Sequence, residues 1–575
     1  MKFKARPIKN SEFSVLSAST ESVMQKLFSS RGVDNPEQVI VGIGQMLMPT
    51  QFKSLDAAGE LMAQYIAQGK RITIVADFDC DGACACAIMM RGLKILGAKE
   101  GTVNYLVPNR VLDGYGLTPP IVDRAIEQFQ AEIIVTVDNG IASLEGVAHA
   151  IKLGLQVVVT DHHLPAMVEG EIKLPNATVI IDPHQPGCGF ESKHICGAGV
   201  AFYLILMTRS IMRKAGVFTI ETQPKEEIDN LFQLVALATV ADVVALDRNN
   251  RCMVAHGLKR IRSKSVYPGI AALFSVAGKN NEQATSIDMG FTIGPRINAA
   301  GRMDDMAIGI KSLINDDKEL AQNYANELHQ FNVKRRKVQE EMGKEAQKII
   351  DEFNEEISLN AIVIHKPSFH EGVIGIVSGK LKEQYNRPAF VFANTHNEDE
   401  IKGSGRSIPG LHLRDALDLI AKRHPDLFKR FGGHSMAAGC TIRKDGLAIF
   451  QAELSKIVET QMTKEQLEQV ILTDGPLPDN CFDVDMAESI GKMVWGNGFE
   501  EPIFMDNFKI VSQQVLKETH LKLVLKSGNQ KREAIWFFRA EPLREEDDIG
   551  IAYKLSINEW QGRKTAQMMV VGAEG

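Results

Sequence analysis

The chain has 575 residues, more than one hydrophobic core usually supports, so about three or four domains are expected. Its formal net charge of −7 excludes attraction of nucleic acid by the field of the whole protein, although local basic groups could still hold DNA. The cysteines form no CxxC pair, the N-terminus lacks the apolar core of a signal peptide, and no apolar run reaches the length of a membrane span. We therefore expect a cytoplasmic protein with reduced thiols and no membrane attachment.

Residues 1–68 form the first predicted segment, which is helical, with helix patterns over residues 20–28 and 57–67. From residue 69 to residue 315, short apolar runs alternate with helix patterns. Such alternation predicts a mostly parallel sheet with helices on both faces. The predicted strands cover residues 72–76, 102–106, 133–137, 157–160 and 178–181.

Three aspartates follow the first predicted strand: Asp77, Asp79 and Asp81. They alternate with Phe78 and Cys80, so an extended chain would point all three carboxylates to one side. There they would repel one another unless a cation lay among them. A solvated acidic loop is the alternative, but such loops rarely follow a buried strand so directly. The pattern therefore favours a metal site.

Polar residues also end three of the later strands. These ends are Asp138-Asn139-Gly140, Asp161-His162-His163 and Asp182-Pro183-His184. Because the carboxyl ends of parallel strands share one edge of a sheet, these side chains should converge with the three aspartates. Imidazole with carboxylate suits manganese, iron or zinc, and carboxylate with water suits magnesium. Any one of these aspartates could instead be a helix N-cap, but four such ends in series are hard to explain by capping.

Asp242 stands in a different context. Residues 231–244 read as a helix that is otherwise almost wholly apolar, which predicts burial. A buried charged residue needs a partner, and a metal ion would provide one.

Together these motifs resemble those of the DHH phosphoesterases, and within that superfamily the bacterial exonucleases that degrade single-stranded DNA from the 5′ end. The motifs are Asp79-Cys80-Asp81-Gly82, Asp138-Asn139-Gly140, Asp161-His162-His163 and Asp242 within residues 239–244. The resemblance implies two divalent cations, Mn²⁺ or Mg²⁺, held by Asp79, Asp81, Asp138, His162 and Asp242. It also implies that Asp138 bridges the cations as a catalytic residue, and that His163 contacts the scissile phosphate or assists proton transfer. Whether Asp77 is a ligand or only orders the metal loop stays open.

Two arginines, Arg296 and Arg302, lie in a predicted glycine-flanked loop, residues 294–302. The residues alone leave solvated arginines as open as a substrate contact, whereas the resemblance favours substrate binding by Arg302. The resemblance also assigns Arg110 to the substrate, with a surface arginine as the alternative. Residues 316–356 follow as one long predicted helix that connects two domains. Its basic run, residues 334–337, either faces the substrate or is solvated.

Residues 357–460 form the next predicted domain, which contains glycine-rich motifs around Ser404, Arg406 and His434. Glycines beside serine and arginine let backbone amides and a guanidinium approach a phosphate closely. Such turns are common, so the motifs alone are a weak signal. Their order after the DHH motifs resembles the DHH-associated domain, which implies that these three residues bind the substrate phosphate.

Residues 461–575 carry five short predicted strands, which suggest a small barrel similar to the OB fold of these exonucleases. The strands cover residues 508–511, 521–525, 534–538, 551–557 and 566–571. Five aromatic residues could stack on bases, although core positions are expected for most of them because they lie in apolar strands. They are Trp495, Trp536, Phe537, Phe538 and Trp560.

The expected fold class is α/β: a mostly parallel-sheet DHH domain, a long connecting helix, a smaller α/β DHH-associated domain and a C-terminal OB-like barrel. The resemblance implies a monomeric metal-dependent exonuclease that removes nucleotides from the 5′ end of single-stranded DNA in recombination and repair. Single-strand-binding protein and a helicase are the implied partners. Two alternatives remain. If the protein were a DHH-type pyrophosphatase or short-oligonucleotide phosphodiesterase, the barrel would have no role. If it were a non-catalytic single-strand binder, the metal motifs would have no role.

Overall fold

The computed structural model describes residues 2–7, 19–33, 41–109, 113–168, 170–303, 305–352, 360–528, 530–543 and 548–574. These residues divide into two compact units. The large unit comprises Arg6–Asn332 and Thr473–Ala573, and the small unit comprises Met1–Ala5 and Val333–Leu472.

Five parallel strands form the central sheet of the large unit, in the order β3-β2-β4-β5-β8. They are β2 (Ile72–Ala76), β3 (Val103–Leu106), β4 (Ile133–Val137), β5 (Gln156–Thr160) and β8 (Val179–Ile181). Each predicted strand is therefore confirmed to within one residue. The chain places β3 and β4 on opposite sides of β2, so the strand order reverses between β2 and β4. Open α/β sheets bind ligands at the carboxyl edge beside such a reversal.

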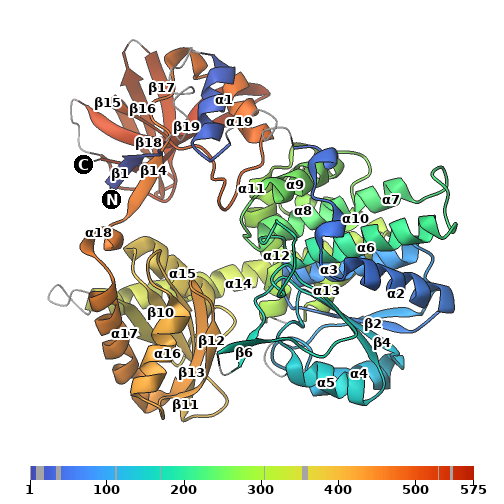
Figure 1. The fold of residues 1–575 in the computed structure, drawn as a ribbon. Helices are drawn as coiled ribbons and strands as arrows, with labels where there is room; N and C mark the ends of the chain where they lie inside the picture. The colour runs from blue at the N-terminus through green and yellow to red at the C-terminus, as the bar shows by residue number, and fades with distance from the viewer. Residues whose placement is uncertain are drawn as a thin grey trace. The chain divides into compact units, whose positions relative to one another are not determined.

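Helices cover both faces of this sheet, as predicted (Figure 1). They are α2 (Leu55–Gln68), α3 (Cys80–Ile95), α4 (Pro119–Phe129), α5 (Leu144–Lys152) and α6 (Gly197–Lys214). Alternate strand residues face opposite sides, because successive side chains of a strand point to opposite faces. Ile74 and Val135 belong to the core that contains α3 and α6, whereas Val75 and Ile134 pack with α4 and α5.

Further helices complete this part of the large unit: α7 (Lys225–Asn230), α8 (Phe232–Ala241), α9 (Arg248–Ile261), α10 (Pro268–Val276), α11 (Ser286–Asp288), α12 (Gly294–Met303) and α13 (Ala307–Ile314). A short hairpin, β6 (Ala166–Val168) and β7 (Glu171–Lys173), follows the fourth strand end.

Residues 294–302 are the helix α12, so the predicted loop is wrong. Its glycines serve close packing rather than turning. A Cβ at Gly294 would lie 2.8 Å from Cβ of Ala241, and one at Gly301 would lie 2.1 Å from the carbonyl oxygen of Phe78. Glycine here lets α12 press against α8 and against the loop after β2.

The C-terminal strands close into a barrel in the order β15-β16-β17-β19-β18, which confirms the OB-like prediction. They are β15 (Phe504–Leu516), β16 (His520–Ser527), β17 (Gln530–Trp536), β18 (Ile549–Trp560) and β19 (Arg563–Ala573).

The aromatic residues of this region differ from the expectation that most are core. Trp495 is buried, but Phe537, Phe538 and Trp560 are 43%, 89% and 72% exposed. The reason is that β17 ends at Trp536, so the two phenylalanines lie beyond the strand, and Trp560 lies at the tip of the β18–β19 hairpin. Trp536 is half-buried.

The helix α1 (Thr20–Ser29) packs against residues that precede the barrel. Phe28 stacks on Trp495 and Phe499 at ring-centroid distances of 6.1 and 6.2 Å, and Arg31 pairs with Asp474 at 2.9 Å. The helix α19 (Val484–Lys492) lies in the same stretch. Residues from both ends of the chain thus share one core with α3 and α6.

The predicted long helix is present as α14 (Lys318–Glu352), which runs from the large unit into the small unit. At 1.5 Å per residue its 35 residues span roughly 50 Å. The predicted end, residues 353–356, lies outside the described residues. Lys334, Arg336 and Lys337 are exposed, in line with a solvated basic face.

The small unit is a second α/β structure whose strands follow the order β12-β13-β11-β10-β9. Only β9 and β10 pair in parallel. Its strands are β9 (Ile362–His365), β10 (Ala389–Asn394), β11 (Glu400–Arg406), β12 (Phe428–Gly433) and β13 (Ala437–Arg443). Its helices after α14 are α15 (Ile374–Tyr385), α16 (Leu413–Arg423), α17 (Leu447–Gln461) and α18 (Lys464–Leu467), and β1 (Lys2–Ala5) pairs with β14 (Val470–Thr473).

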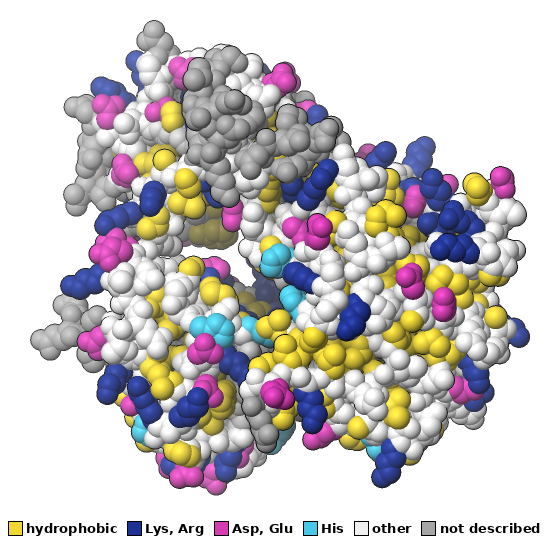
Figure 2. Space-filling view, viewed as in Figure 1, with side chains coloured by type: hydrophobic (Ala, Val, Ile, Leu, Met, Phe, Trp, Pro, Cys, Tyr) yellow, Lys and Arg dark blue, Asp and Glu magenta, His cyan; other side chains and the backbone are white. Residues whose placement is uncertain are grey.

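All eight cysteines are free, as expected, and seven of them are buried. In the described ranges, no helix combines the length and the apolar character that crossing a membrane requires. Basic and acidic side chains are interspersed over the visible faces of both units (Figure 2).

Candidate metal centre

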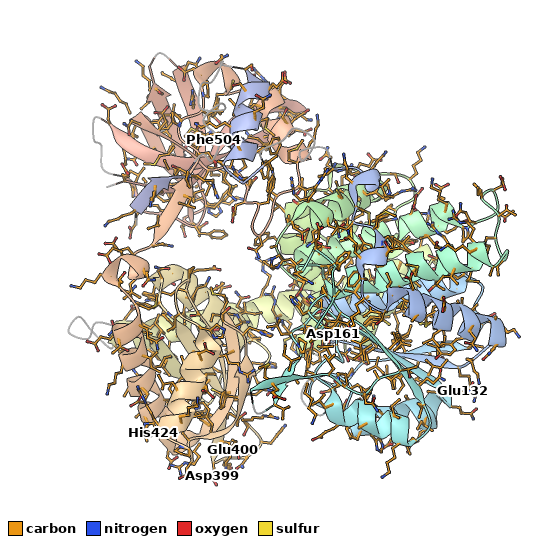
Figure 3. All side chains as sticks on the ribbon, in the orientation of Figure 1. Glu132, Asp161, Asp399, Glu400, His424 and Phe504 are labelled. Carbon is orange, nitrogen blue, oxygen red and sulfur yellow. The ribbon has the colours of Figure 1, made fainter. Side chains whose placement is uncertain are left out.

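The carboxyl edge of the parallel sheet brings the predicted metal residues together. Asp161 lies where β5 ends, whereas Glu132 lies directly before β4, at the opposite edge (Figure 3). At the carboxyl edge, three overlapping groups have ligand atoms within 4.8 Å of one another. The groups are Asp77, Asp79 and Asp138; Asp81, His162 and Asp242; and Asp138, His162 and His163.

The first aspartates are held by helix N-termini. Asp79 caps α3 by accepting bonds from the backbone N–H groups of Asp81 and Gly82, at 2.9 and 3.1 Å. The carboxylate of Asp81 accepts N–H bonds from Gly197 and Ala198, the first residues of α6, at 2.7 and 2.8 Å. Capping was the alternative to a metal site, but Asp79 caps a helix and also lies in the cluster.

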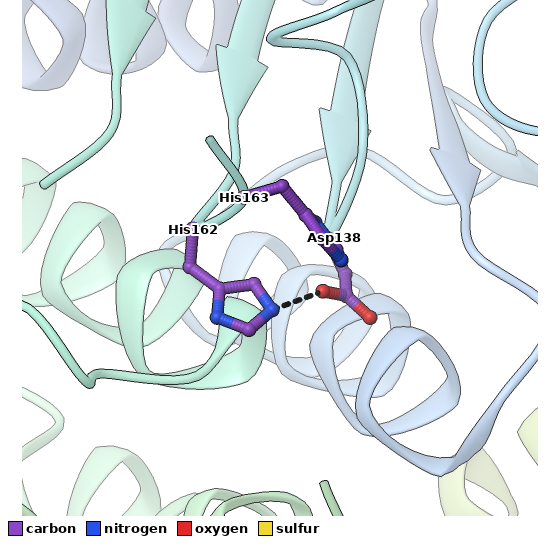
Figure 4. Close-up of side chains that lie close together, drawn as sticks. All are labelled: Asp138, His162 and His163. Carbon is purple, nitrogen blue, oxygen red and sulfur yellow. Dashed lines mark ion pairs between the residues drawn. The ribbon is translucent and has the colours of Figure 1, made fainter. Parts of the chain in front are cut away.

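His162 is the meeting point of the other carboxylates. Its Nε2 lies 3.1 Å from Oδ1 of Asp138 (Figure 4), 3.7 Å from Oδ2 of Asp242 and 3.8 Å from Oδ2 of Asp81. Asp138 reaches this position with a left-handed backbone, φ 60°, which is uncommon outside glycine. Three of the predicted carboxylate ligands thus surround one ring nitrogen.

Burial sets the protonation of this cluster. Burial, with the Asp79 carboxylate nearby, raises the pKa of Asp81 to about 7. Burial and the charge of Asp81 also raise the pKa values of Asp138 and Asp242 well above their ordinary range. Burial and the neighbouring His163 lower the pKa of His162 to about 3, so its ring is neutral, the form in which imidazole binds metals.

The donor set fits divalent cations. Among the described residues, the buried Oδ1 of Asp138 and Nε2 of His162 form no hydrogen bond, although they lie only 3.1 Å apart. Buried polar atoms without a hydrogen bond are rare, and a bound ion is one explanation of them. Aspartate oxygens and one neutral imidazole suit Mn²⁺, and they also suit Mg²⁺ with added water ligands.

His163 faces a different partner. Its Nδ1 lies 2.7 Å from Oδ1 of Asp161, which also accepts the backbone N–H groups of His162 and His163, while Oδ2 accepts that of Ile141 at 2.9 Å. Burial disfavours the charged ring, but the ion pair with Asp161 outweighs it and raises the pKa of His163 to about 10. The hydroxyl of Tyr115 lies 3.3 to 3.4 Å from both ring nitrogens.

Three features of the site were not predicted: Asp161 as the residue that orients both histidines, Tyr115, and the N-terminus of α6. Tyr115 donates to the carbonyl oxygen of Asp138 at 3.3 Å. It stands between glycines 114 and 116, a turn signal that could have drawn attention. The amides of α6 have no such signal, because backbone groups carry no sequence pattern.

The fifth strand end does not join the cluster. Asp182 is buried, accepts the backbone N–H of His184 at 2.6 Å and belongs to none of the candidate ligand groups among the described residues. Burial, with Asp161 nearby, raises its pKa to about 8. His184 is half-buried in the loop after β8.

The arginines expected near the substrate are placed differently from one another. Arg296 is buried, donates through Nη1 to the carbonyl oxygen of Thr292 and lies 3.3 Å from Nδ1 of His329. Arg302 is half-buried on α12, the helix whose Asn298 accepts the backbone N–H of Cys80 at 2.7 Å. Arg302 therefore lies on a helix that contacts the metal loop, while Arg110 is outside the described residues.

In the small unit, Ser404 and Arg406 lie on the strand β11 and not in a loop, so that expectation is wrong. A Cβ at Gly403 or Gly405 would lie 2.4 or 2.3 Å from the rings of Phe392 and Phe390, so the glycines make room for aromatic rings. The alternation leaves Ser404 and Arg406 on the opposite face, with Nη1 of Arg406 3.3 Å from Oγ of Ser404.

His434 lies directly after β12, in the turn to β13. It is exposed, and its backbone N–H donates to the carbonyl oxygen of Ala437 at 2.7 Å. Ala437 is the register partner of Arg406. His434 thus belongs to the same end of the small sheet as Arg406.

Known proteins match the chain over nearly its whole length. Three family models match: the N-terminal domain of the DHH family over residues 71–239, the DHHA1 domain over residues 344–460 and the RecJ OB domain over residues 473–572. The single-stranded-DNA-specific exonuclease RecJ of Haemophilus influenzae is 42% identical over 565 residues, 96% of each chain. That of Escherichia coli is 38% identical over 563 residues, again 96% of each.

A solved structure supports the same relationship. The crystal structure of RecJ from Thermus thermophilus in complex with Mn²⁺ matches with a TM-score of 0.80 at 26% identity, over 100% of this chain and 79% of that chain. Sequence relatives, domain matches and fold agree, and the chain belongs to the RecJ family of single-stranded-DNA-specific exonucleases.

Proposed function

We propose that this protein is a metal-dependent exonuclease that degrades single-stranded DNA from the 5′ end and serves DNA recombination and repair in the cytoplasm. The observation that carries the proposal is the convergence of Asp81, Asp138 and Asp242 on Nε2 of His162 at the carboxyl edge of the sheet. Membership of the RecJ family supports the substrate, single-stranded DNA. A monomer acts with single-strand-binding protein and with a helicase, which would supply single strands.

Asp79, Asp81, Asp138, His162 and Asp242 would hold two divalent cations, Mn²⁺ or Mg²⁺, and Asp138 would serve as a ligand of both. Such a pair lowers the pKa of a bound water and neutralises charge that develops on the phosphate. Asp77 orders the metal loop by accepting the backbone N–H of Phe78 through Oδ1 at 2.7 Å, and it also belongs to one of the candidate ligand groups.

His163 contacts the scissile phosphate or moves a proton there. The bond to Asp161 fixes the ring through Nδ1 and favours its charged form, which suits donation to an anionic oxygen. Tyr115 limits the rotation of the same ring.

The 5′ polarity rests on recognition of a terminal phosphate by Ser404, Arg406 and His434. A guanidinium fork beside a hydroxyl binds a terminal phosphate better than an internal one, because the terminal group offers more free oxygens and more charge. Arg302 and Arg110 contact the substrate as well.

The first experiment compares substrates in the presence of Mn²⁺ or Mg²⁺: a long single strand labelled at either end, a blunt duplex, a dinucleotide and pyrophosphate. We expect mononucleotides to be released from the 5′ end of the single strand and the duplex to be nearly inert. Release that begins at the 3′ end would overturn the polarity. Hydrolysis of only the dinucleotide or pyrophosphate would favour a small-substrate enzyme, and binding without hydrolysis would favour a non-catalytic binder.

The second experiment separates the two histidines. His162→Ala should weaken Mn²⁺ binding and abolish hydrolysis, whereas His163→Ala should bind Mn²⁺ nearly normally and slow the chemical step. Equal loss of metal affinity in both variants would mean that their roles are assigned wrongly. Near-normal turnover by Asp138→Ala would contradict the two-metal proposal.

A third experiment tests the phosphate residues. Arg406→Ala should lose most of the preference for 5′-phosphorylated over 5′-hydroxyl strands while Mn²⁺ binding stays normal. Arg414→Ala, which removes an exposed arginine from α16 of the same unit, is the matched control. A preference as strong in Arg406→Ala as in the parent would contradict the assignment.

A further inference from the structure

The residue after Asp242 has a backbone conformation that its side chain disfavours. α8 ends at Ala241, and Val243 has φ 59°, in the left-handed region. A β-branched residue is a genuine outlier there, because its side chain collides with the backbone, and glycine is the usual occupant of this position after a helix. Val243 is 63% exposed, so packing of its side chain does not compensate. Something else must hold this turn.

A turn from the C-terminal part of the chain holds it. The side-chain Nδ2 of Asn497 donates to the carbonyl oxygen of Val243 at 2.8 Å. In return, the backbone N–H of Leu246 donates to the carbonyl oxygen of Asn497, also at 2.8 Å. The two bonds clamp both ends of the four-residue segment 243–246, directly after Asp242.

This clamp is itself firmly anchored. Gly496 and Phe499 exchange two backbone hydrogen bonds, at 3.0 and 3.1 Å, which close a tight turn around Asn497. Trp495, next to it, is bonded through its backbone to Oγ of Ser286 at 2.8 and 3.2 Å. The guanidinium of Arg251 lies 4.3 Å from the centre of the Phe499 ring. Because of these contacts, the turn around Asn497 cannot move along with the segment 243–246 if that segment relaxes.

We propose that Asn497 is a positioning residue of the metal centre: its amide fixes the strained backbone at Val243 and so holds the Asp242 carboxylate against His162. The proposal rests on the proposed function in one respect, that Asp242 is a metal ligand. It links the segment that leads into the barrel to the metal centre, because Asn497 precedes β15 by only a few residues. Loss of the amide should let the turn relax and withdraw the carboxylate.

A purely structural role makes a different prediction. If Asn497 only joined two parts of the large unit, its removal would lower the melting temperature and leave the Mn²⁺ affinity of the folded protein unchanged. Relief of strain at Val243 would then restore nothing. The two roles can therefore be separated by metal affinity and by a second substitution at Val243.

The test measures Mn²⁺ affinity by electron paramagnetic resonance titration of the full chain without DNA, with circular dichroism as the check on folding. Asn497→Ala and the isosteric Asn497→Asp should weaken Mn²⁺ binding by about 10- to 100-fold, as loss of outer partners of ligands usually does. Asn507→Ala is the matched control, because Asn507 lies exposed on β15. It should bind as the parent does.

The deciding comparison uses Val243→Gly, since glycine adopts the left-handed conformation without strain. In that background, Asn497→Ala should weaken binding by less than about 3-fold. Unchanged affinity of Asn497→Ala, or equal loss in both backgrounds, would overturn the proposal. If Asn497→Ala alone does not fold, folding and Mn²⁺ binding by the double variant support it, and misfolding of both overturns it. A parent chain that binds no Mn²⁺ would instead refute the proposed function.

Discussion

Gly197→Ala should disturb the metal centre, although Gly197 is not itself a proposed ligand. Gly197 begins α6, donates its N–H to Asp81 and lies so close to Asp138 that a Cβ would be 2.6 Å from both Cβ and Oδ1 of that residue. Ordinary contacts need about 3.5 Å, so one side must move by about 0.9 Å. The alanine variant therefore displaces Asp138, Asp81 or both. A shift of this size at a reactive site can cost about 100-fold in rate.

The matched control is Gly92→Ala on α3, where a Cβ would lie 2.7 Å from Cδ1 of Ile205 on α6, away from the carboxylates and from His162. Overpacking should cost both variants about 1–3 kcal/mol of stability, measured by urea unfolding. Only Gly197→Ala should also lose Mn²⁺ affinity, by about 10- to 100-fold in a titration, and turnover of labelled single strands. A Gly197→Ala protein with the metal affinity and turnover of the parent would refute this reasoning, and so would equal metal loss in the control.

Three further results are expected. Because burial raises the pKa of Asp81 to about 7, the metal-free fold holds a proton that the unfolded chain releases near pH 4; stability should fall as pH rises through this window. Mn²⁺ should accordingly raise the melting temperature more at pH 8 than at pH 6, and an equal rise at both would contradict this. Replacing Phe538 and Trp560 by alanine should weaken binding of long single strands by about 1–3 kcal/mol per lost stacking contact, without changing turnover at saturation. Unchanged binding would show that these side chains do not meet DNA. Gly405→Ala should destabilise the small unit by about 1–3 kcal/mol, because its Cβ meets the ring of Phe390, and an unchanged urea midpoint would place it in an open turn.

The sequence was most informative where polar residues directly followed the apolar run of a predicted strand. Five apolar runs predicted the five parallel strands to within one residue, because a strand that is buried on both faces of a sheet reads as a nearly continuous apolar run. Polar residues at the ends of those runs then predicted the cluster, since parallel strands share one carboxyl edge. His162 and Asp242 are distant in sequence, but fold geometry brings them within 3.7 Å.

Glycine was where the sequence misled. The Gly-Ser-Gly-Arg motif and residues 294–302 were predicted as loops, because glycine most often marks turns. In the structure, Gly403 and Gly405 lie beneath aromatic rings, and Gly301 lies beneath the metal loop. A glycine that allows close approach looks the same in a sequence as one that turns the chain. Only the identity of its neighbour in space separates them.

The solvent exposure of aromatic side chains was the second property that the sequence did not predict. Phe538 and Trp560 follow apolar stretches and read as core, but β17 ends before Phe538, and Trp560 is the last residue of β18 before the hairpin turns. A shift of one or two residues in a strand end decides whether an aromatic side chain packs or reaches solvent. The clamp on Val243 was likewise invisible, because residues 243 and 497 belong to segments that no sequence pattern connects.

The electrostatics of the cluster explain why a bound metal would matter to the fold as well as to the reaction. In the part of the chain that the structure describes, Asp79, Asp81, Asp138 and Asp242 form no ion pair with lysine or arginine; three of them instead lie nearest to the ring of His162, whose low pKa keeps it neutral. The amides at the starts of α3 and α6 orient two of these carboxylates but carry only partial charge. Buried carboxylates without counter-ions are costly, so the site either binds protons or binds cations. A lysine in this position would satisfy the carboxylates permanently and leave no room for a cation, which is why backbone amides, and not basic side chains, hold the centre in place.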